Sequence, residues 1–425
     1  MLTLPYIREN KERILAGLET RNYSQESKAS LDKIIELDDR RKANQAERDD
    51  SLSQVNKLSK EIGALYQSGD RDKAEEMKAL VSDIKEKAKD LEAQQQDILG
   101  QLDELLLTIP NVPHPTVPSG HTDEDNEVVR PWKEEVAPIE GGLPHWELAT
   151  KYGLIDFETG TKITGSGFPL FRGLGARLER ALINFFLDSA STAGYDEVIP
   201  PLVVNADSAR ATGQLPDKEG QMYYVERDDL YLIPTAEVPV TNIYRDVIIN
   251  ESDFPIKLTG YTPCFRREAG SYGADVKGLN RVHQFDKVEI VQIAHPDKSY
   301  ETLDEMVAYV AGLLDQLELP YRILRLCGGD LGFTSALTYD FEVYSAGQGR
   351  WLEVSSVSNF ETFQANRLRL RYKDAEGKKH LTHTLNGSAL ALARIVAAIL
   401  ENNQVEDGII VPEVLRSYMR CEKIT

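Results

Sequence analysis

The sequence Cys264-Phe265-Arg266-Arg267-Glu268-Ala269-Gly270 is followed, after a short glycine-containing loop, by Arg281-Val282-His283-Gln284-Phe285-Asp286-Lys287-Val288-Glu289-Ile290. Both runs alternate apolar with polar residues, which predicts two strands joined by a loop. The pair carries arginines, carboxylates and an aromatic ring. Any one of these residues alone would be interpreted as part of a solvated face or of the core. Together they have the composition of a ligand-binding site.

Five stretches of the chain, in the same order, resemble those of one enzyme family. The strand pair resembles motif 2 of the class II aminoacyl-tRNA synthetases, in the form typical of seryl-tRNA synthetases. Residues 194–202 resemble motif 1 and residues 386–394 resemble motif 3, with Thr235-Ala236-Glu237 and Glu353-Val354-Ser355-Ser356 also in family order. The resemblance covers essentially the whole chain. It implies activation of L-serine with ATP, followed by transfer of serine to tRNA(Ser), and it leaves open whether tRNA(Sec) is also charged.

Composition limits the alternatives. With 425 residues the chain is long enough for two or three domains. Its net charge of −20 argues against nonspecific coating of nucleic acid, which needs clustered Lys and Arg. No run of about 18 uncharged apolar residues occurs and the amino terminus lacks a signal peptide's apolar core, so we expect a cytoplasmic protein. The cysteines, Cys264, Cys327 and Cys421, are too widely spaced for a zinc cluster, so no structural zinc is expected.

Residues 28–108 are almost free of proline and predict two long helices. Apolar residues alternate steps of four and three, the seam of a left-handed coiled coil. Because residues 67–70 form a turn signal, we expect an antiparallel hairpin. Residues 38–50 and 94–96 are polar at about the same distance from this turn, which supports the register. The seam residues are Leu52, Val55, Ser59, Ile62 and Tyr66 in the first helix and Met77, Val81, Ile84, Ala88, Leu91, Gln95, Ile98, Leu102, Leu105 and Ile109 in the second.

The hairpin has two interpretations. A helical spacer or a dimerising coiled coil is the commoner role of such segments. The resemblance instead implies the arm that seryl enzymes extend to the tRNA. Its candidate phosphate contacts are Arg40, Arg41, Lys42, Arg48, Lys57 and Lys60.

The Pro-rich run 110–118 ends the second helix, because proline removes a donor and restricts the residue before it. We therefore predict an arm domain over 1–110, a linker over 111–120 and a catalytic domain over 121–425. Strands paired through short turns predict an α+β fold, an antiparallel sheet flanked by helices as in class II catalytic domains. The pattern predicts helices near 172–192, 298–317 and 387–403, and strands around 222–234 and 338–370. Neither a phosphate loop nor a strand-linked dinucleotide motif occurs.

Activation of serine brings its carboxylate against the α-phosphate of ATP, and these two anions repel. A guanidinium can bridge both without losing its proton. The resemblance assigns this role to Arg266, and it places Arg281 and Arg394 on the leaving pyrophosphate, with Arg266 and Arg394 as the catalytic residues. It places Phe285 on the adenine ring, Glu268 on the adenine amino group, and Mg²⁺ on Glu353 and Ser356. The implied ATP-binding set is Arg266, Arg267, Glu268, Arg281, Val282, Phe285, Glu353, Val354, Ser355, Ser356 and Arg394.

Arg394 is also informative without the resemblance. It stands in a run rich in Ala, Leu, Ile and Val. A lone cation there is costly to bury unless an anion lies nearby, so the pattern favours a phosphate partner.

Serine recognition needs partners for an ammonium and a hydroxyl in a small pocket. Two carboxylates would offset the ammonium and accept from the hydroxyl, and the sequence does not divide these roles between Glu237 and Glu289. Arg267 stands where a small residue is expected, and on a strand it would point to the opposite face. The implied serine-binding set is Thr235, Ala236, Glu237, Arg266, Glu289, Asn386 and Ser388.

The motif 1 resemblance implies a homodimer, with Pro201 and the helix before Gly194 at the interface. One alternative is an amino acid ligase of the same fold that charges a carrier protein, although such a ligase has no need of a long arm. Another is an inactive RNA-binding paralogue. The residues that argue against it are the intact Arg266, Glu268, Glu353 and Arg394.

Overall fold

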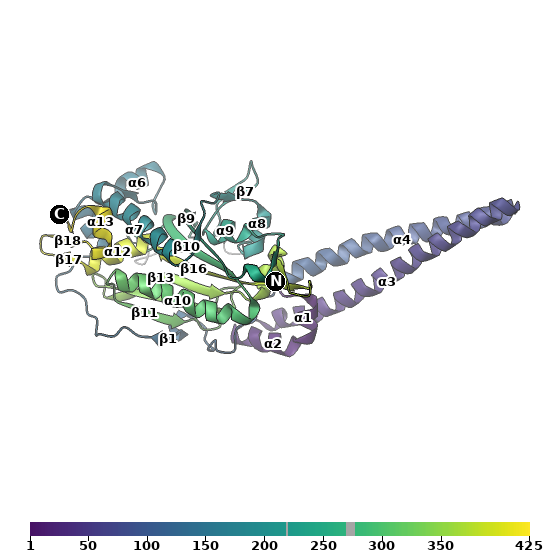
Figure 1. Cartoon of the computed structure of the whole chain (residues 1–425), viewed down its shortest axis with the longest axis horizontal. Coiled ribbons are helices and arrows are strands. Elements are labelled where there is room, and N and C mark those ends of the chain that lie inside the picture. The colour runs from purple at the N-terminus through teal and green to yellow at the C-terminus, as the bar shows by residue number, and fades with distance from the viewer. Residues whose placement is uncertain (218–219, 269–276) are drawn as a thin grey trace. The chain divides into compact units, whose positions relative to one another are not determined.

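The computed structural model describes residues 1–217, 220–268 and 277–425 (Figure 1). Ala269 and Gly270 of the quoted motif lie outside the described residues. The described residues form two compact units. One contains Met1–Glu19 and Tyr23–Pro110, and the other contains Thr20–Asn22 and Asn111–Thr425.

The first unit is helical, and the predicted hairpin is confirmed. Helices α3 (Gln25–Ser68) and α4 (Arg71–Leu106) run side by side and are joined by a turn at Gly69, whose φ is +86° (Figure 1). Near the end of the predicted seam, Leu106 is buried in place of Leu105, which is half-buried, and Ile109 is buried as predicted. Helices α1 (Leu4–Glu9) and α2 (Lys11–Thr20) precede the hairpin. The buried residues of α4 are Ala74, Val81, Ala88, Leu91, Gln95, Ile98, Leu102 and Leu106.

A polar layer interrupts this seam where the sequence predicted it. Asn44 and Gln94 are equally far along the chain from Gly69, and Asn44 Nδ2 donates to Gln94 Oε1 at 3.4 Å. This pairing confirms the antiparallel register of the hairpin.

Within the described residues, the second unit is built on an eight-stranded sheet with the order β1-β11-β12-β13-β16-β10-β9-β4. Neighbouring strands in it are antiparallel, apart from the parallel pair β4 and β9. The predicted antiparallel sheet is therefore confirmed. The strands are β1 (Glu127–Arg130), β4 (Asp196–Glu197), β9 (Ile256–Phe265), β10 (Gln284–Ala294), β11 (Tyr321–Arg325), β12 (Leu337–Ser345), β13 (Arg350–Asn359) and β16 (His383–Ala391).

Smaller elements surround this sheet. The helices are α5 (His145–Lys151), α6 (Phe157–Ile163), α8 (Ala206–Thr212), α9 (Glu237–Asn242), α11 (Thr362–Leu368) and α13 (Arg416–Met419). The strands are β2 (Ile155–Asp156), β3 (Leu170–Phe171), β5 (Val203–Val204), β6 (Tyr224–Val225), β7 (Leu230–Leu232), β8 (Ile248–Asn250), β14 (Arg371–Lys373), β15 (Lys379–Leu381), β17 (Gln404–Val405), β18 (Gly408–Ile410) and β19 (Lys423–Ile424). No described helix combines the length and the apolar character that crossing a membrane requires.

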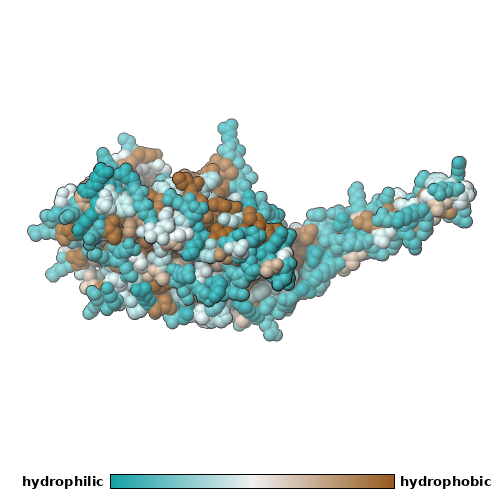
Figure 2. All heavy atoms as spheres, in the orientation of Figure 1, coloured by the Kyte–Doolittle hydropathy of each residue, from teal (hydrophilic) through white to brown (hydrophobic). Residues whose placement is uncertain are grey.

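An apolar segment follows β4 on the surface. Ile199 is 92% exposed, and Leu202 and Val203 are about 40% exposed. Pro201 between them is also exposed. Figure 2 shows apolar side chains gathered on this face of the unit, around α9 and β7, and Val203 pairs with Leu232 of β7.

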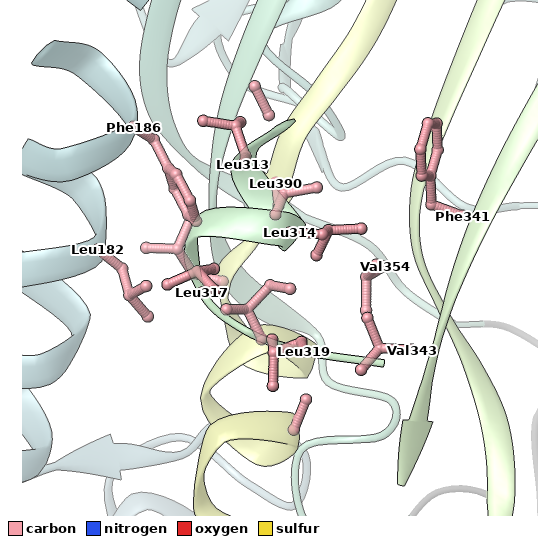
Figure 3. Packing of buried hydrophobic residues seen from close by; sticks show 14 of the residues in the cluster. Leu182, Phe186, Leu313, Leu314, Leu317, Leu319, Phe341, Val343, Val354 and Leu390 are labelled. Atoms are coloured by element: carbon pink, nitrogen blue, oxygen red, sulfur yellow. The ribbon is translucent and has the colours of Figure 1, made fainter. Parts of the chain in front are cut away.

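The core lies between the sheet and the helices α7 (Gly173–Thr192), α10 (Ser299–Gln316) and α12 (Leu392–Asn402). Leu178, Leu182, Phe185 and Phe186 recur with helical spacing and form the buried stripe of α7. In Figure 3, Leu182 and Phe186 point toward the leucines at the end of α10. The helices thus cover one face of the sheet.

Three details of the prediction are wrong. Residues 387–391, predicted as helix, complete β16, because pairing with β10 outweighs the helix propensity of Ala and Leu. Residues 362–368, predicted within strands, form α11. Strand β9 ends at Phe265, so Arg267 follows the strand, and it is exposed with its N–H donating to Gln221 O.

Residues 111–120, predicted as a linker, pack within the second unit. Asn111 is buried, and its Nδ2 donates to the carbonyl oxygens of Thr334 and Phe360 at 2.9 and 2.8 Å. Its N–H donates to Phe333 O. Arg21 adds a further anchor, because its guanidinium donates to the Asn111 carbonyl oxygen at 2.9 Å.

Candidate active site

One face of the sheet gathers several of the predicted site residues. Glu289 pairs with Ser388, and Asn386 pairs with Ser358. Directly paired residues share a face, as do residues two apart on one strand. The register therefore places a row of polar and aromatic side chains on the face opposite the core. These are Phe285, Lys287 and Glu289 of β10, Asn386 and Ser388 of β16, and Ser356 of β13.

A β-bulge brings Glu353 to the same face as Ser356. Residues three apart on a regular strand point to opposite faces. Here Ser356 pairs with Asp340 and Glu353 pairs with Glu342, so β13 has one more residue than β12 between these pairs. The extra residue brings Ser356 Oγ to 3.4 Å from Glu353 Oε1, to which it donates.

The neighbours of this pair on β13 face elsewhere. The Val354 side chain is buried in the core, and Ser355 Oγ donates to Ser388 O at 2.6 Å. Of the four residues predicted for ATP binding on β13, Glu353 and Ser356 therefore have side-chain oxygens on the sheet face that also carries Phe285.

Asp340, which was not among the predicted site residues, joins this oxygen group. Its Oδ1 is buried and has no hydrogen-bond partner among the described residues. Burial and the neighbouring charge of Glu353 raise the pKa of Asp340 well above its usual range, although a hydrogen bond with Ser356 opposes this. The alternation of acids at Asp340 and Glu342 on one strand was the available signal.

This oxygen group fits a hard cation that is shared with a substrate. No three His, Cys, Asp or Glu side chains of the described ranges form a group that could hold a metal ion by themselves. Mg²⁺ commonly takes one or two carboxylates and completes its shell with waters and substrate phosphates. The orphaned Asp340 oxygen next to Glu353 and Ser356 matches that chemistry.

Arg266 lies directly after β9, next to the strand that carries Phe285. Its N–H donates to His283 O at 2.9 Å, and its Nε donates to Pro234 O at 3.3 Å. The guanidinium carbon lies 5.3 Å from the centroid of the Phe285 ring, a cation–π contact. The two residues predicted for the α-phosphate and the adenine ring are therefore neighbours.

Arg281 and Glu268 form an ion pair, with 3.0 Å between Arg281 Nε and Glu268 Oε2. The Arg281 side chain is about half exposed, at 46%. Glu268 has a φ of +46°, in the left-handed region that is uncommon outside glycine. Val282, also predicted for ATP binding, has its side chain buried in the core.

Arg394 lies in the first turn of α12 and contacts Glu353. Its NH1 donates to Glu353 O and lies 3.7 Å from Glu353 Oε2. Its Nε donates to Asn280 O at 3.3 Å. Arg394 thus joins the β13 carboxylate to the segment that carries Arg281.

The predicted serine residues surround a buried group of charges. Thr235 Oγ1 donates to Glu289 Oε2 at 3.1 Å, and Lys287 Nζ lies 2.5 Å from the same oxygen. Glu289 is 1% exposed. Lys287, which was not among the predicted site residues, supplies the counter-charge. Its position two residues before Glu289 on β10 was the available signal.

Glu237 has a different environment. Gln364 Nε2 donates to Glu237 Oε1 at 2.6 Å, and Glu237 N–H donates to Thr235 Oγ1 at 3.2 Å. Burial, together with the charge of Glu289, raises the pKa of Glu237 to about 7. Ala236 is fully buried beneath this group. Asn386 is half-buried on the same sheet face as Ser388.

The cations of the arm fall into two sets. Arg41 and Lys42 pair with the buried Asp38 at 2.8 and 2.9 Å, and Arg48 pairs with Glu92. Burial opposes ionisation of Asp38, but hydrogen bonds from these cations and from Arg8 lower its pKa to about 2. The remaining candidates are exposed and form no ion pair within the described part of the chain: Arg40, Lys57 and Lys60.

Cys264 is fully buried, and burial raises the pKa of its thiol. The thiolate is the nucleophilic form of cysteine. Cys264 therefore stays protonated and is not a nucleophile in this site.

Comparison with known proteins identifies similar chains over the full length. Residues 1–113 match the family model of the seryl-tRNA synthetase N-terminal domain, and residues 223–403 match that of the class II core domain of the G, H, P, S and T synthetases. The serine--tRNA ligase of Salinibacter ruber is 50% identical and the alignment covers 100% of this chain and 99% of the relative. That of Geobacter sulfurreducens is 47% identical, covering 99% and 98%.

Two solved structures have the same fold over the whole chain. Seryl-tRNA synthetase from Pyrococcus horikoshii, complexed with ATP, is 34% identical with a TM-score of 0.91 and covers 100% of this chain and 99% of its own. The cytoplasmic serine-tRNA ligase of Naegleria fowleri, in complex with AMP, is 29% identical with a TM-score of 0.87 and the same coverage.

Proposed function

The chain belongs to the seryl-tRNA synthetase family of class II aminoacyl-tRNA synthetases, and from that premise we propose how its residues activate L-serine with ATP and charge tRNA(Ser). One observation carries the proposal. A buried group of Thr235, Glu237 and Glu289 lies on the same sheet face as Phe285, over which the Arg266 guanidinium is held. Amino acid and nucleotide sites thus share one surface.

We propose that Arg266 bridges the serine carboxylate and the α-phosphate. Both anions approach each other as the carboxylate oxygen attacks phosphorus and pyrophosphate leaves. A guanidinium held by the carbonyl oxygen of Pro234 stabilises the charge of this transition state without further reorganisation. Phe285, on the sheet face over which the Arg266 guanidinium lies, stacks on the adenine ring of ATP.

Arg281 and Arg394 receive the leaving pyrophosphate in this proposal. Arg281 exchanges its contact with Glu268 for phosphate oxygens, which releases the Glu268 carboxylate for the adenine amino group. The half exposure of Arg281 supports this exchange, because the guanidinium does not have to leave a buried pair.

Glu353, Ser356 and the neighbouring Asp340 would hold Mg²⁺ together with the phosphates. When bound, the ion supplies positive charge that offsets the phosphate oxygens. The residues themselves bring two carboxylates close together. The buried Asp340 Oδ1, which has no hydrogen-bond partner among the described residues, supports the fit.

Glu237 and Glu289 divide the recognition of serine in this proposal. Glu289 keeps one oxygen on Lys287 and Thr235, so its other oxygen is left to accept from the serine hydroxyl. Glu237, whose pKa is about 7 in the free protein, binds the ammonium group of serine. Asn386 and Ser388 complete the pocket from β16.

Two further proposals concern partners. The arm contacts tRNA phosphates through exposed cations, and tRNA(Sec) is charged together with tRNA(Ser). The exposed Ile199, Leu202 and Val203 around Pro201 support a homodimer, since contiguous exposed apolar surface marks interaction sites.

The test of this function is pyrophosphate exchange with each of the twenty amino acids, followed by charging of total tRNA with the best substrate. We expect exchange with serine alone and charging of serine-accepting tRNA. Serine-independent exchange, or charging of a carrier protein in place of tRNA, would contradict it.

Replacing Arg266 with Ala should lower kcat for pyrophosphate exchange by about 10²-fold or more, because the bridging charge acts in the transition state. The KM for ATP should change less. Arg266→Lys is the matched control: it keeps the charge but loses the planar fork, so we expect poor rescue. A near-normal kcat in Arg266→Ala would remove this residue from the mechanism.

Serine binding should weaken in acid. Only ionised Glu237 offsets the ammonium, and its pKa in the free protein is about 7. As pH falls from 7 to 6 this carboxylate takes up a proton, so KM for serine should rise by about fivefold, whereas KM for ATP stays level. In Glu237→Gln, KM for serine should be high and independent of pH. If KM for serine in the wild type does not change with pH, a group other than Glu237 binds the ammonium.

A further inference from the structure

A buried pair, His145 and Glu401, lies outside the reacting face and has no role in the proposed chemistry. His145 begins α5 and Glu401 belongs to α12, and both side chains are 0% exposed. His145 Nδ1 lies 2.7 Å from Glu401 Oε1, which also accepts from the His145 N–H at 2.9 Å. Burial opposes ionisation of Glu401, but the hydrogen bonds from His145 and Ser345 outweigh it and lower its pKa.

The contacts of the imidazole fix its tautomer. Leu279 N–H donates to His145 Nε2 at 2.8 Å, so Nε2 carries a lone pair rather than a proton. In a neutral imidazole the proton then resides on Nδ1, which donates to Glu401. His145 is therefore a fixed bridge from a carboxylate to one backbone amide.

That amide belongs to the segment 277–283, which carries Arg281. The segment lies outside the helices and strands, so its position depends on individual hydrogen bonds rather than on a sheet ladder. Gly278 lies against the same imidazole, since a Cβ there would come within 2.3 Å of His145 Nε2. The chain is thus held closely against His145.

Helix α12 holds two consecutive residues of this segment. Arg394 donates to Asn280 O, and Glu401 reaches Leu279 N–H through His145. Arg394 and Glu401 are seven residues apart, two turns of one helix face. Gln348 closes the network, donating to Glu401 at 3.0 Å and accepting from Asn280 Nδ2 at 2.9 Å.

We propose that His145, oriented by Glu401, is a positioning residue that holds Arg281 and Arg394 in place for the phosphates of ATP and for pyrophosphate. This rests on the proposed function of these two arginines. Leu279 and Val282 are buried and anchor the segment by packing, so the fold does not depend on the imidazole. The imidazole fixes the backbone from which Arg281 projects.

Two substitutions separate this role from a structural one. In His145→Gln the amide oxygen reaches the former Nε2 position and accepts from Leu279 N–H, but the bond to Glu401 is lost. In His145→Asn the amide nitrogen stands near the former Nδ1 position and donates to Glu401, but Leu279 N–H loses its partner. Each variant loses one buried hydrogen bond, so their melting temperatures should fall alike.

We expect His145→Asn to raise KM for ATP and pyrophosphate, or lower kcat for exchange, by about 10- to 100-fold in total, as a misplaced charged group does. His145→Gln should stay within a few-fold of the wild type, and KM for serine should change in neither. Equal exchange kinetics in the two variants would overturn the proposal.

If His145→Asn does not fold, Gly278→Ala provides the test, because its Cβ would come within 2.3 Å of His145 Nε2 and would move the segment off the imidazole, while His145 itself is kept. A KM for ATP that is raised while KM for serine is unchanged supports the proposal, and an unchanged KM for ATP overturns it. Serine-dependent exchange by the wild type is measured first. Its absence would reject the proposed function itself and not the positioning role.

Discussion

Removing the outer arm should abolish tRNA charging and leave serine-dependent pyrophosphate exchange intact. The hairpin belongs to a compact unit separate from the one that carries the proposed active site. The structure refines the cut. Deleting all of 28–108 would uncover Ile7, Ile14 and Leu18, which are buried in the same unit, whereas replacing residues 46–92 with a short Gly-containing turn keeps the Asn44–Gln94 contact that closes the base.

Both activities should be measured on the same preparation. The matched control is the triple variant Lys33→Ala, Lys73→Ala, Lys78→Ala, because each of these lysines already pairs with an acid on the arm. The test variant Arg40→Ala, Lys57→Ala, Lys60→Ala should lower the salt dependence of tRNA binding by about one unit of slope per lost phosphate contact. Normal charging by the shortened enzyme, or loss of exchange in a folded one, would contradict the separation.

The second large effect concerns discrimination against alanine. Alanine is smaller than serine and fits the pocket, so rejection must come from an acceptor left unpaired, which contributes on the order of 10⁴-fold in kcat/KM. If Glu289 is that acceptor, replacing it with Ala should depress exchange with serine far more than with alanine. Threonine should remain poor, since its methyl group meets the pocket wall.

The buried Lys287 complicates this experiment. Removing Glu289 alone strands a cation that is 7% exposed, and breaking a buried pair costs about 3–5 kcal/mol. The double variant Lys287→Met, Glu289→Ala removes both charges, with Lys287→Met as its control. If the ratio of exchange rates with serine and with alanine is unchanged in the folded double variant, Glu289 does not accept from the serine hydroxyl, and Glu237 or Thr235 has this role.

How much of this site was predictable differs from residue to residue. Arg266, Phe285 and Glu289 lie in one short stretch, whose alternating pattern predicted the strands, while the resemblance implied the ligands. Glu353 and Ser356 were predicted by resemblance, but a strict two-residue period would separate them onto opposite faces. A β-bulge brings both residues to one face, because β13 has one more residue than β12 between the points where Ser356 and Glu353 pair with β12.

Local pattern alone determined the arm and the long helices α7 and α10 of the second unit. Apolar residues spaced three and four apart form one stripe on a helix. Burying this stripe stabilises the helix, whatever element it packs against. The same reasoning failed at residues 387–391. Their Ala-Leu composition favours a helix, yet strand pairing with β10 decides their conformation, and no local signal reports that β10 lies beside them.

The sequence by itself thus determined the family, the sheet, the arm and the residue types of the site. Only the tertiary structure decided which polar groups meet: Asp340 with Glu353, Lys287 with Glu289, and His145 with Glu401 and the Leu279 amide. The last three residues are separated by more than a hundred positions along the chain. The physical reason is that a buried polar group must find its partner within about 3 Å, and packing of the whole domain decides which distant group stands there.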